Sequence, residues 1–195
     1  MNELMTKPNL FEKYCKNKEH AKEVEKYSLM ILSALKNRVE DFKNMPEKAT
    51  EYLSQASLLH DIGYCIEKKS HHKHTMTIIK NEGIENYTNE EVDIIANVAR
   101  YHRGSFPDTN KHEAFAQLTQ ENQTLVTKLG AILRLADGLD KPHKNLILRM
   151  EANETEETVD IKIKTIGFKP NLKMAEEKKD LLEFVLQKKI NFLFM

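Results

Sequence analysis

Histidines and aspartates set into apolar segments are the residues of this chain whose types and spacing could do chemistry. The chain has eight histidines, and three of them fall within residues 71–74. The candidates at expected helix ends or faces are His20, His60, Asp61, His71, His72, His74, His102 and Asp137. A carboxylate on a buried face is costly unless it is paired or binds a metal. Imidazole with carboxylate is a ligand set for divalent transition metals, so the pattern indicates a metal site.

Amphipathic helices are expected to position these residues. Apolar side chains recur at helical spacing in five long segments and one shorter one. The segments cover 17–40, 46–64, 72–83, 88–102 and 122–139, with the shorter helix over 113–120. The run Thr88-Asn89-Glu90-Glu91 is typical of a capping box and should begin the fourth of the long helices.

The pattern changes after residue 143. Alternation over 146–151 and 158–166 predicts two strands, and the polar stretch between them predicts a hairpin. Residues 174–191 return to helical spacing, and we expect this helix to cover the hairpin, which would be marginal alone. The sequence thus predicts a mainly α fold, with a helical domain over 1–143 and a small α+β extension, 144–195, packed on it.

Composition excludes several classes of protein. With 195 residues, 40% of them apolar, the chain can bury a sizeable core. Thirty basic residues balance thirty acidic ones, which argues against a general nucleic-acid binder. No apolar run is long enough to cross a membrane, and residues 1–20 lack the apolar core of a signal peptide. Two cysteines without CxxC spacing complete the expectation of a cytoplasmic protein.

Five separated motifs carry a resemblance to a known family. After His20 come LLHDIG (58–63), HHKH (71–74), ARYHR (99–103) and LRLADGLD (133–140). In this order they resemble the HD-domain superfamily of metal-dependent phosphohydrolases. The chain is most similar to the C-terminal HD domain of the exopolyphosphatase/guanosine-pentaphosphate phosphohydrolase (Ppx/GppA) family, from about residue 10 to about residue 190. The resemblance implies an HD-domain helical bundle with a small C-terminal β-hairpin plus helix.

The chain also departs from that family. Nothing in it resembles the family's N-terminal actin-like half, which holds the glycine-rich phosphate loops, so processive polyphosphate hydrolysis is not expected to transfer. Full-length relatives often have His-Glu where this chain has His60-Asp61, the metal-competent form. This difference favours a phosphohydrolase that works without the missing half.

The resemblance implies one or two divalent ions, with Mn, Fe, Zn, Co and Mg all open. His20, His60, Asp61 and Asp137 would hold one ion, and His60 and Asp61 would form the catalytic pair. Asp61 would bridge to a second ion held by His102 and a histidine of residues 71–74. Spacing leaves open which of His71, His72 and His74 it is, and His72 and His74 are our ligand candidates.

Basic residues beside these motifs could neutralise phosphate oxygens. The candidates are Lys73, Arg103, Arg134 and Lys141. Asp140 is expected to be a capping or surface acid outside the site.

Three functions remain open on this sequence. The first is metal-dependent hydrolysis of a small phosphorylated molecule, a nucleotide being the favoured substrate. The second is a non-catalytic module that binds polyphosphate or a guanosine phosphate and works with a separate phosphatase chain. The third is a helical interaction scaffold whose histidines are vestigial. A homodimer is compatible with each of them.

Overall fold

The computed structural model describes residues 9–140 and 146–195, and helices make up most of them. The phosphate-binding candidate Lys141 lies outside the described residues. The helices before the gap are α1 Leu10–Tyr14, α2 Lys18–Arg38, α3 Glu40–Lys43, α4 Ala49–Leu59, a 3₁₀ helix Ile62–Cys65, α5 His71–Glu82, α6 Asn89–Arg100, α7 Glu113–Ala116 and α8 Gln120–Leu139. After the gap follow β1 Ile147–Glu154, β2 Thr158–Thr165, α9 Lys173–Lys178, α10 Asp180–Leu186 and β3 Lys189–Phe194.

Helices α2, α6 and α8 begin where a side chain satisfies one of the free main-chain N–H groups. Asn17 caps α2 by accepting from the main chain of His20. The capping box predicted at Thr88 is confirmed, because its hydroxyl and the Glu91 carboxylate each accept from the other's main chain. Gly83, at φ 70°, follows α5 in a conformation that favours glycine. Local sequence therefore sets the start of α2 and α6 and the end of α5.

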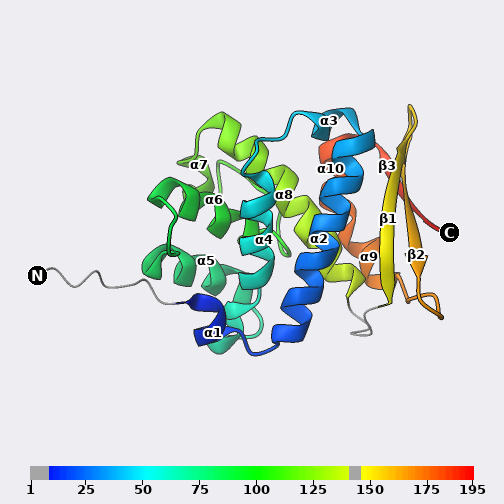
Figure 1. Ribbon diagram of the computed structural model, residues 1–195. Helices are drawn as coiled ribbons and strands as arrows, with labels where there is room; N and C mark the ends of the chain where they lie inside the picture. The colour runs from blue at the N-terminus through cyan, green and yellow to red at the C-terminus, as the bar shows by residue number, and fades with distance from the viewer. Residues whose placement is uncertain (1–8, 141–145) are drawn as a thin grey trace, which may run out of the picture.

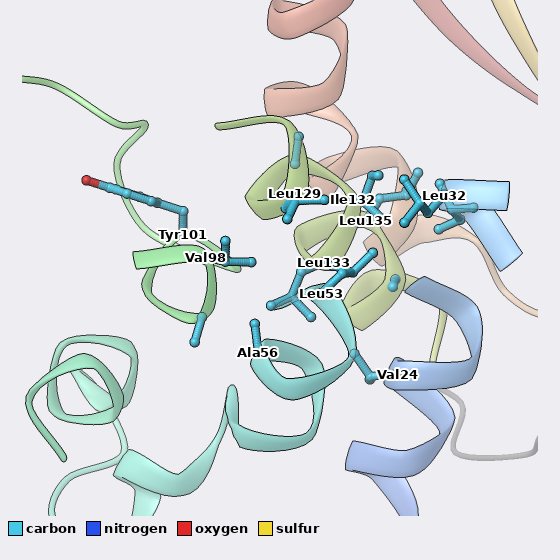
Figure 2. Packing of buried hydrophobic residues seen from close by; sticks show 14 of the residues in the cluster. Val24, Leu32, Leu53, Ala56, Val98, Tyr101, Leu129, Ile132, Leu133 and Leu135 are labelled. Carbon is cyan, nitrogen blue, oxygen red and sulfur yellow. The ribbon is translucent and has the colours of Figure 1, made fainter. Parts of the chain in front are cut away.

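Helices α2 and α8 occupy the centre of the molecule (Figure 1). Helix α2 contacts α4 and α8 on one side and β1 on the other, and α8 also contacts α6, α9 and α10. Figure 2 shows how Val24 and Leu32 of α2 face Leu53 and Ala56 of α4 and the apolar side of α8. The second half of α8 is apolar on most sides, which is typical of a helix that other elements enclose. In agreement, 13 residues of α8 are buried.

The C-terminal part forms a small sheet beside α2 (Figure 1). The predicted hairpin is confirmed, with β1 antiparallel to β2. The inner face of the sheet joins the same hydrophobic core as the helices through Ile147, Val159 and Ile161. The mainly α class with a C-terminal hairpin and helix is thus confirmed, while the division into two units at residue 143 stays a prediction.

Two details of the C-terminal part differ from the prediction. The single helix expected over 174–191 is two helices, α9 and α10, and it ends at Leu186 because Gln187 adopts a left-handed conformation at φ 51°. The remaining residues form β3, which pairs in parallel with β2. Since β2 and β3 are parallel, the chain must cross over between them, and α9 and α10 lie on that crossover. Among the described helices, none combines the length and the apolar character that a membrane span requires.

Candidate metal centre

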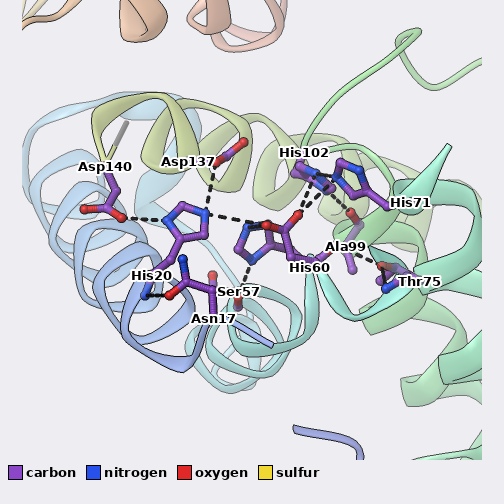
Figure 3. A network of polar contacts seen from close by, with 12 residues as sticks. Asn17, His20, Ser57, His60, His71, Thr75, Ala99, His102, Asp137 and Asp140 are labelled. Carbon is purple, nitrogen blue, oxygen red and sulfur yellow. Dashed lines mark hydrogen bonds and ion pairs between the residues drawn. The ribbon is translucent and has the colours of Figure 1, made fainter. Parts of the chain in front are cut away.

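Four histidines and three aspartates converge where the ends of five elements meet (Figure 3). Helix α2 supplies a histidine from its first turn, α4 ends at a His-Asp pair, α5 begins with a histidine, α6 is followed by one, and α8 ends with two aspartates. These residues are His20, His60, Asp61, His71, His102, Asp137 and Asp140. Asp61 is the most open of the seven, with 22% of its side chain exposed.

Asp61 lies between two pairs of histidines. Its Oδ2 atom is 3.7 Å from His20 Nε2 and 3.5 Å from His60 Nε2. Its Oδ1 atom is 3.0 Å from His71 Nε2 and 3.7 Å from His102 Nε2. The structure therefore contains two triplets of possible metal ligands, and Asp61 belongs to both of them.

Each of the four histidines is oriented by a short contact of its Nδ1 atom, the ring nitrogen that faces away from Asp61. The Nδ1 atoms of His60, His71 and His102 lie 2.7–2.8 Å from the carbonyl oxygens three residues earlier, those of Ser57, Lys68 and Ala99. The Nδ1 atom of His20 is 2.6 Å from Asp140 Oδ2. Since a carbonyl oxygen can only accept, Nδ1 of the first three rings must donate, as in metal sites where a second partner sets the ring's tautomer.

The atoms that face the middle of the cluster are therefore mostly hydrogen-bond acceptors. His71 Nε2 and His102 Nε2 lie 3.0 Å apart, although both rings already donate through Nδ1. His60 Nε2 is buried and has no hydrogen-bond partner among the described residues. A buried acceptor without a donor is unfavourable. A cation in the middle would satisfy all of these atoms, so the residues present fit a divalent metal.

The charges of Asp61 and His102 agree with this fit, and that of His20 depends on whether an ion is bound. Burial raises the pKa of Asp61, but the nearby rings of His60 and His71 outweigh it and hold the pKa below its usual range. Burial lowers the pKa of His102 well below the ordinary value and keeps its ring neutral. Burial also opposes protonation of His20, yet Asp137 and Asp140 raise its pKa to about 9. Ionised carboxylates and neutral imidazoles are the forms that bind metal, so Asp61 and His102 are in the binding form, whereas an ion at His20 would displace the proton that this ring carries at neutral pH.

The close packing of the His-Asp turn on α5 positions two of the histidines. A Cβ atom at Gly63 would lie 2.0 Å from the main-chain oxygen of His71, so only glycine fits there. The hydroxyl of Thr75 accepts from Gly63 N and donates to the His60 carbonyl, both over 2.9 Å. The glycine in LLHDIG thus allows the start of α5 to lie directly on the turn that carries Asp61.

Within the histidine cluster of residues 71–74, only His71 belongs to a triplet, the one that it forms with Asp61 and His102. His72 is buried beside Gly104, and its ring centre is 6.4 Å from that of His102. His74 is partly exposed and faces Glu67 at 3.5 Å. The ligand candidates His72 and His74 therefore lie outside the two triplets, because successive residues of a helix point in different directions.

The three described candidates for phosphate binding differ in exposure and in their partners. Lys73 is exposed on α5, and Arg103 is half-buried beside Tyr64. Arg134 makes a bidentate ion pair with Asp180 of α10, at 2.7 Å for both contacts, and donates to the Gly104 carbonyl at 2.8 Å. The guanidinium expected to contact phosphate is thus engaged in joining α8 to α10.

Two residues of the cluster were not expected from the sequence. Asp140 holds the His20 ring, although it was expected to be a capping or surface acid. Lys178 of α9 forms an ion pair with Asp137. Asp140, the C-cap residue of α8, follows Asp137 by three residues, and this spacing could have indicated that the two carboxylates lie on the same side of the helix. Lys178 lies in the charged run Glu176–Asp180, which gives no such signal.

The fold and the site define a mainly helical protein with a buried histidine and aspartate cluster of the metal-binding type. The family model described as Ppx/GppA phosphatase, domain III, matches residues 4–188, and the chain belongs to this family. One similar protein is the "Guanosine-5'-triphosphate,3'-diphosphate pyrophosphatase" of Pseudoalteromonas atlantica, which is 33% identical over 105 residues. The match covers 54% of this chain and 20% of that relative, so the chain corresponds to a minor part of it.

Proposed function

We propose that this protein is a metal-dependent phosphohydrolase of the HD type that acts on a small phosphorylated molecule, with a nucleotide as the favoured substrate. The observation that carries the proposal is the position of Asp61, whose two oxygens face two different pairs of histidine Nε2 atoms. A carboxylate in that position can bridge two ions. Membership of a phosphatase family supports the same class of reaction.

In this proposal the chain's residues hold and orient the ions. His20, His60, Asp61 and Asp137 would hold one ion, and Asp61, His71 and His102 would hold the second. When bound, such ions supply a nucleophilic water at neutral pH and stabilise charge on phosphoryl oxygens. The carbonyl contacts of the three oriented rings keep their Nε2 lone pairs directed inward before any ion arrives. The phosphate group would approach the ions on the side where Asp61 is 22% exposed.

Charge and the comparisons support the proposed substrate class. Phosphoryl transfer depends mainly on positioning and charge stabilisation, so the site requires no nucleophilic side chain. Lys73 is exposed one residue from His72, and Arg103 follows His102, so both could meet the anionic end of a substrate. The relative from Pseudoalteromonas atlantica is named for a guanosine polyphosphate, which makes such nucleotides and short polyphosphates the first substrates to test.

Metal content and phosphate release test this proposal together. Protein purified without chelator or affinity metal should contain one or two equivalents of a divalent metal by elemental analysis, and Asp61→Asn should contain none. The matched control is Asp41→Asn, an exposed aspartate of α3. Phosphate release from guanosine polyphosphates, nucleotides and short polyphosphates should follow the metal content. Wild-type protein that takes up neither Mn²⁺ nor Zn²⁺ would rule the proposal out.

A second candidate function is a binding module that works with a separate phosphatase chain. The observation that favours it is that the match covers only 20% of the relative's length, so the activity for which that relative is named need not reside in the matched region. The two candidates differ in one result. Tight binding of polyphosphate or guanosine polyphosphate without turnover, in metal-loaded protein, would support the binding module.

A further inference from the structure

Lys178 brings a positive charge from the C-terminal part of the chain to the edge of the metal centre. Its ammonium forms an ion pair with Asp137 Oδ2, and the two side chains are only 14% and 6% exposed. The other carboxylate oxygen of Asp137, Oδ1, lies 3.4 Å from His20 Nε2. One carboxylate therefore joins the lysine to the histidine that would hold the first ion.

The packing of α9 on α8 fixes this position. A Cβ atom at Gly138 would lie 2.9 Å from the Met174 carbonyl oxygen and 3.0 Å from Ala175 Cα, so the two helices approach each other as closely as their backbones allow. Ala175 is completely buried in that contact. Lys178 follows Ala175 by three residues and therefore lies on the same face of its helix, toward α8. Asp137 directly precedes Gly138, which places the two charges together.

An ion bound at Asp137 would change the surroundings of this ammonium. Like charges that share one carboxylate repel each other, and the repulsion is strong where water is partly excluded. A lysine has a flexible stem and three donors, so its ammonium can move to a nearby anion while its helix stays in place. The anion that a phosphohydrolase brings to this position is a phosphoryl group.

We propose that Lys178 is a phosphate-binding residue of this site, paired with Asp137 in the metal-free protein and released to a phosphoryl oxygen of the substrate when metal is bound. The inference rests on the proposed function, because it needs an ion at Asp137. It adds a residue from outside the motifs at 58–63, 71–74, 99–103 and 133–140. It also assigns a role in the site to the C-terminal part of the chain.

The first test is metal binding by calorimetry on metal-free protein. Lys178→Met removes the competing charge, so Mn²⁺ should bind roughly tenfold more tightly than it does to wild-type protein. Lys178→Arg keeps the charge and should bind Mn²⁺ like the wild type. The matched control is Lys173→Met, an exposed lysine of the same helix, which should change nothing. Unchanged or weaker Mn²⁺ binding by Lys178→Met would overturn the competition with metal.

The second test is binding of inorganic phosphate to Mn²⁺-loaded protein. Lys178→Met should bind phosphate roughly tenfold more weakly, Lys178→Arg should recover most of the affinity, and Lys173→Met should equal the wild type. With a hydrolysed substrate, the variant should raise KM more than it lowers kcat. Equal phosphate affinity in wild type and Lys178→Met would overturn the phosphate-binding role.

The two proposals fail in different ways. If wild-type protein takes up no metal, the proposed function is wrong. If the wild type takes up Mn²⁺, Asp61→Asn does not, and Lys178→Met binds phosphate like the wild type, only the role of Lys178 is wrong. Circular dichroism of each variant checks that the helices are intact. If Lys178→Met does not fold, Lys178→Gln, which also removes the charge, is expected to give the same two results and is measured in its place.

Discussion

Thr75 donates a hydrogen bond over 2.9 Å to the main-chain carbonyl of His60, and both residues are completely buried. The same hydroxyl accepts from Gly63 N, so one side chain connects α5 to both ends of the turn that contains Asp61. The distance between the His60 and His71 rings therefore depends on a hydroxyl that is not itself a metal ligand.

Thr75→Val should destabilise the protein by about 1–3 kcal/mol, because it leaves two buried main-chain groups without this partner. Urea unfolding of metal-free protein measures the change. Thr77→Val is the matched control, since the Thr77 hydroxyl is exposed and bonds only its own helix, to the Lys73 carbonyl. Equal stability of the two variants would show that the Thr75 hydroxyl does not hold the turn.

Gly63→Ala should cost at least about 3 kcal/mol, because its Cβ atom would meet the main-chain oxygen of His71 and neither backbone can move aside freely. It should also reduce metal content, since α5 carries His71. Gly167→Ala is a useful comparison: nothing lies within 4 Å of its Cβ position, but its φ is 71°. Only backbone strain of about 1–2 kcal/mol is expected there. A Gly63→Ala protein that keeps its metal and its stability would contradict this account of the turn.

Metal removal should lower the melting temperature of the wild-type protein. A ligand that binds only the folded state, at a free concentration of 100 times its Kd, stabilises by about 2.7 kcal/mol. Melting curves recorded with Mn²⁺ and with a chelator should therefore differ by several degrees. Asp61→Asn should melt at the same temperature in both conditions, and a difference equal to that of the wild type would place the ion elsewhere.

The pH dependence of stability should include a contribution from Glu91. Hydrogen bonds with Lys48, and then with Thr88, lower the pKa of this carboxyl from 4.5 to about 2. A depressed pKa in the folded state contributes stability that is present above pH 4.5 and is lost as the pH falls toward 2. Glu91→Gln keeps the acceptor of the capping box but loses the charge. The free energy of unfolding of the wild type should therefore exceed that of Glu91→Gln at pH 7, and the difference should be smaller at pH 3. The same difference at both pH values would exclude a contribution from the lowered pKa of Glu91.

The ion pair between Arg134 and Asp180 provides a test of the sequence-based phosphate assignment. A lysine cannot make the two parallel hydrogen bonds of the Arg134 guanidinium with the Asp180 carboxylate. Arg134→Lys should therefore destabilise the protein by about 1 kcal/mol, a value that takes account of the partial exposure of Asp180. Asp180→Asn should cost a similar amount, and the double variant should cost less than the sum. If Arg134→Lys instead weakens phosphate binding without changing stability, the guanidinium belongs to the substrate site.

The sequence motifs predicted most residues of the histidine and aspartate cluster, because each motif lies at or beside the end of a helix whose apolar residues recur at helical spacing. The order His20, His60-Asp61, His102 and Asp137 is enough to bring those side chains together once the helices pack. The position of His71 was not predictable in the same way. It is the first residue of α5, and the direction of its side chain depends on how α5 rests on Gly63, a tertiary contact.

The third strand was missed for a related reason. Residues 189–194 follow α10 without a proline or glycine, and their alternation covers too few positions to separate them from a helical end. The left-handed conformation of Gln187 ends α10 and allows β3 to pair with β2. Nothing in the charged run Glu176–Asp180 distinguishes Lys178 from its neighbours, so its contact with Asp137 became visible only with the packing of α9.

Because β2 and β3 pair in parallel, the segment between them, residues 166–188, is a tether that the sheet holds at both ends. Lys178 lies on this tether, with the sheet anchoring the chain before and after it. The ammonium is therefore kept at a high effective concentration beside Asp137, even when no bond joins the two. If β3 were released, the contact between Ala175 and Gly138 would be left to hold that charge in place, although every metal ligand would be unchanged.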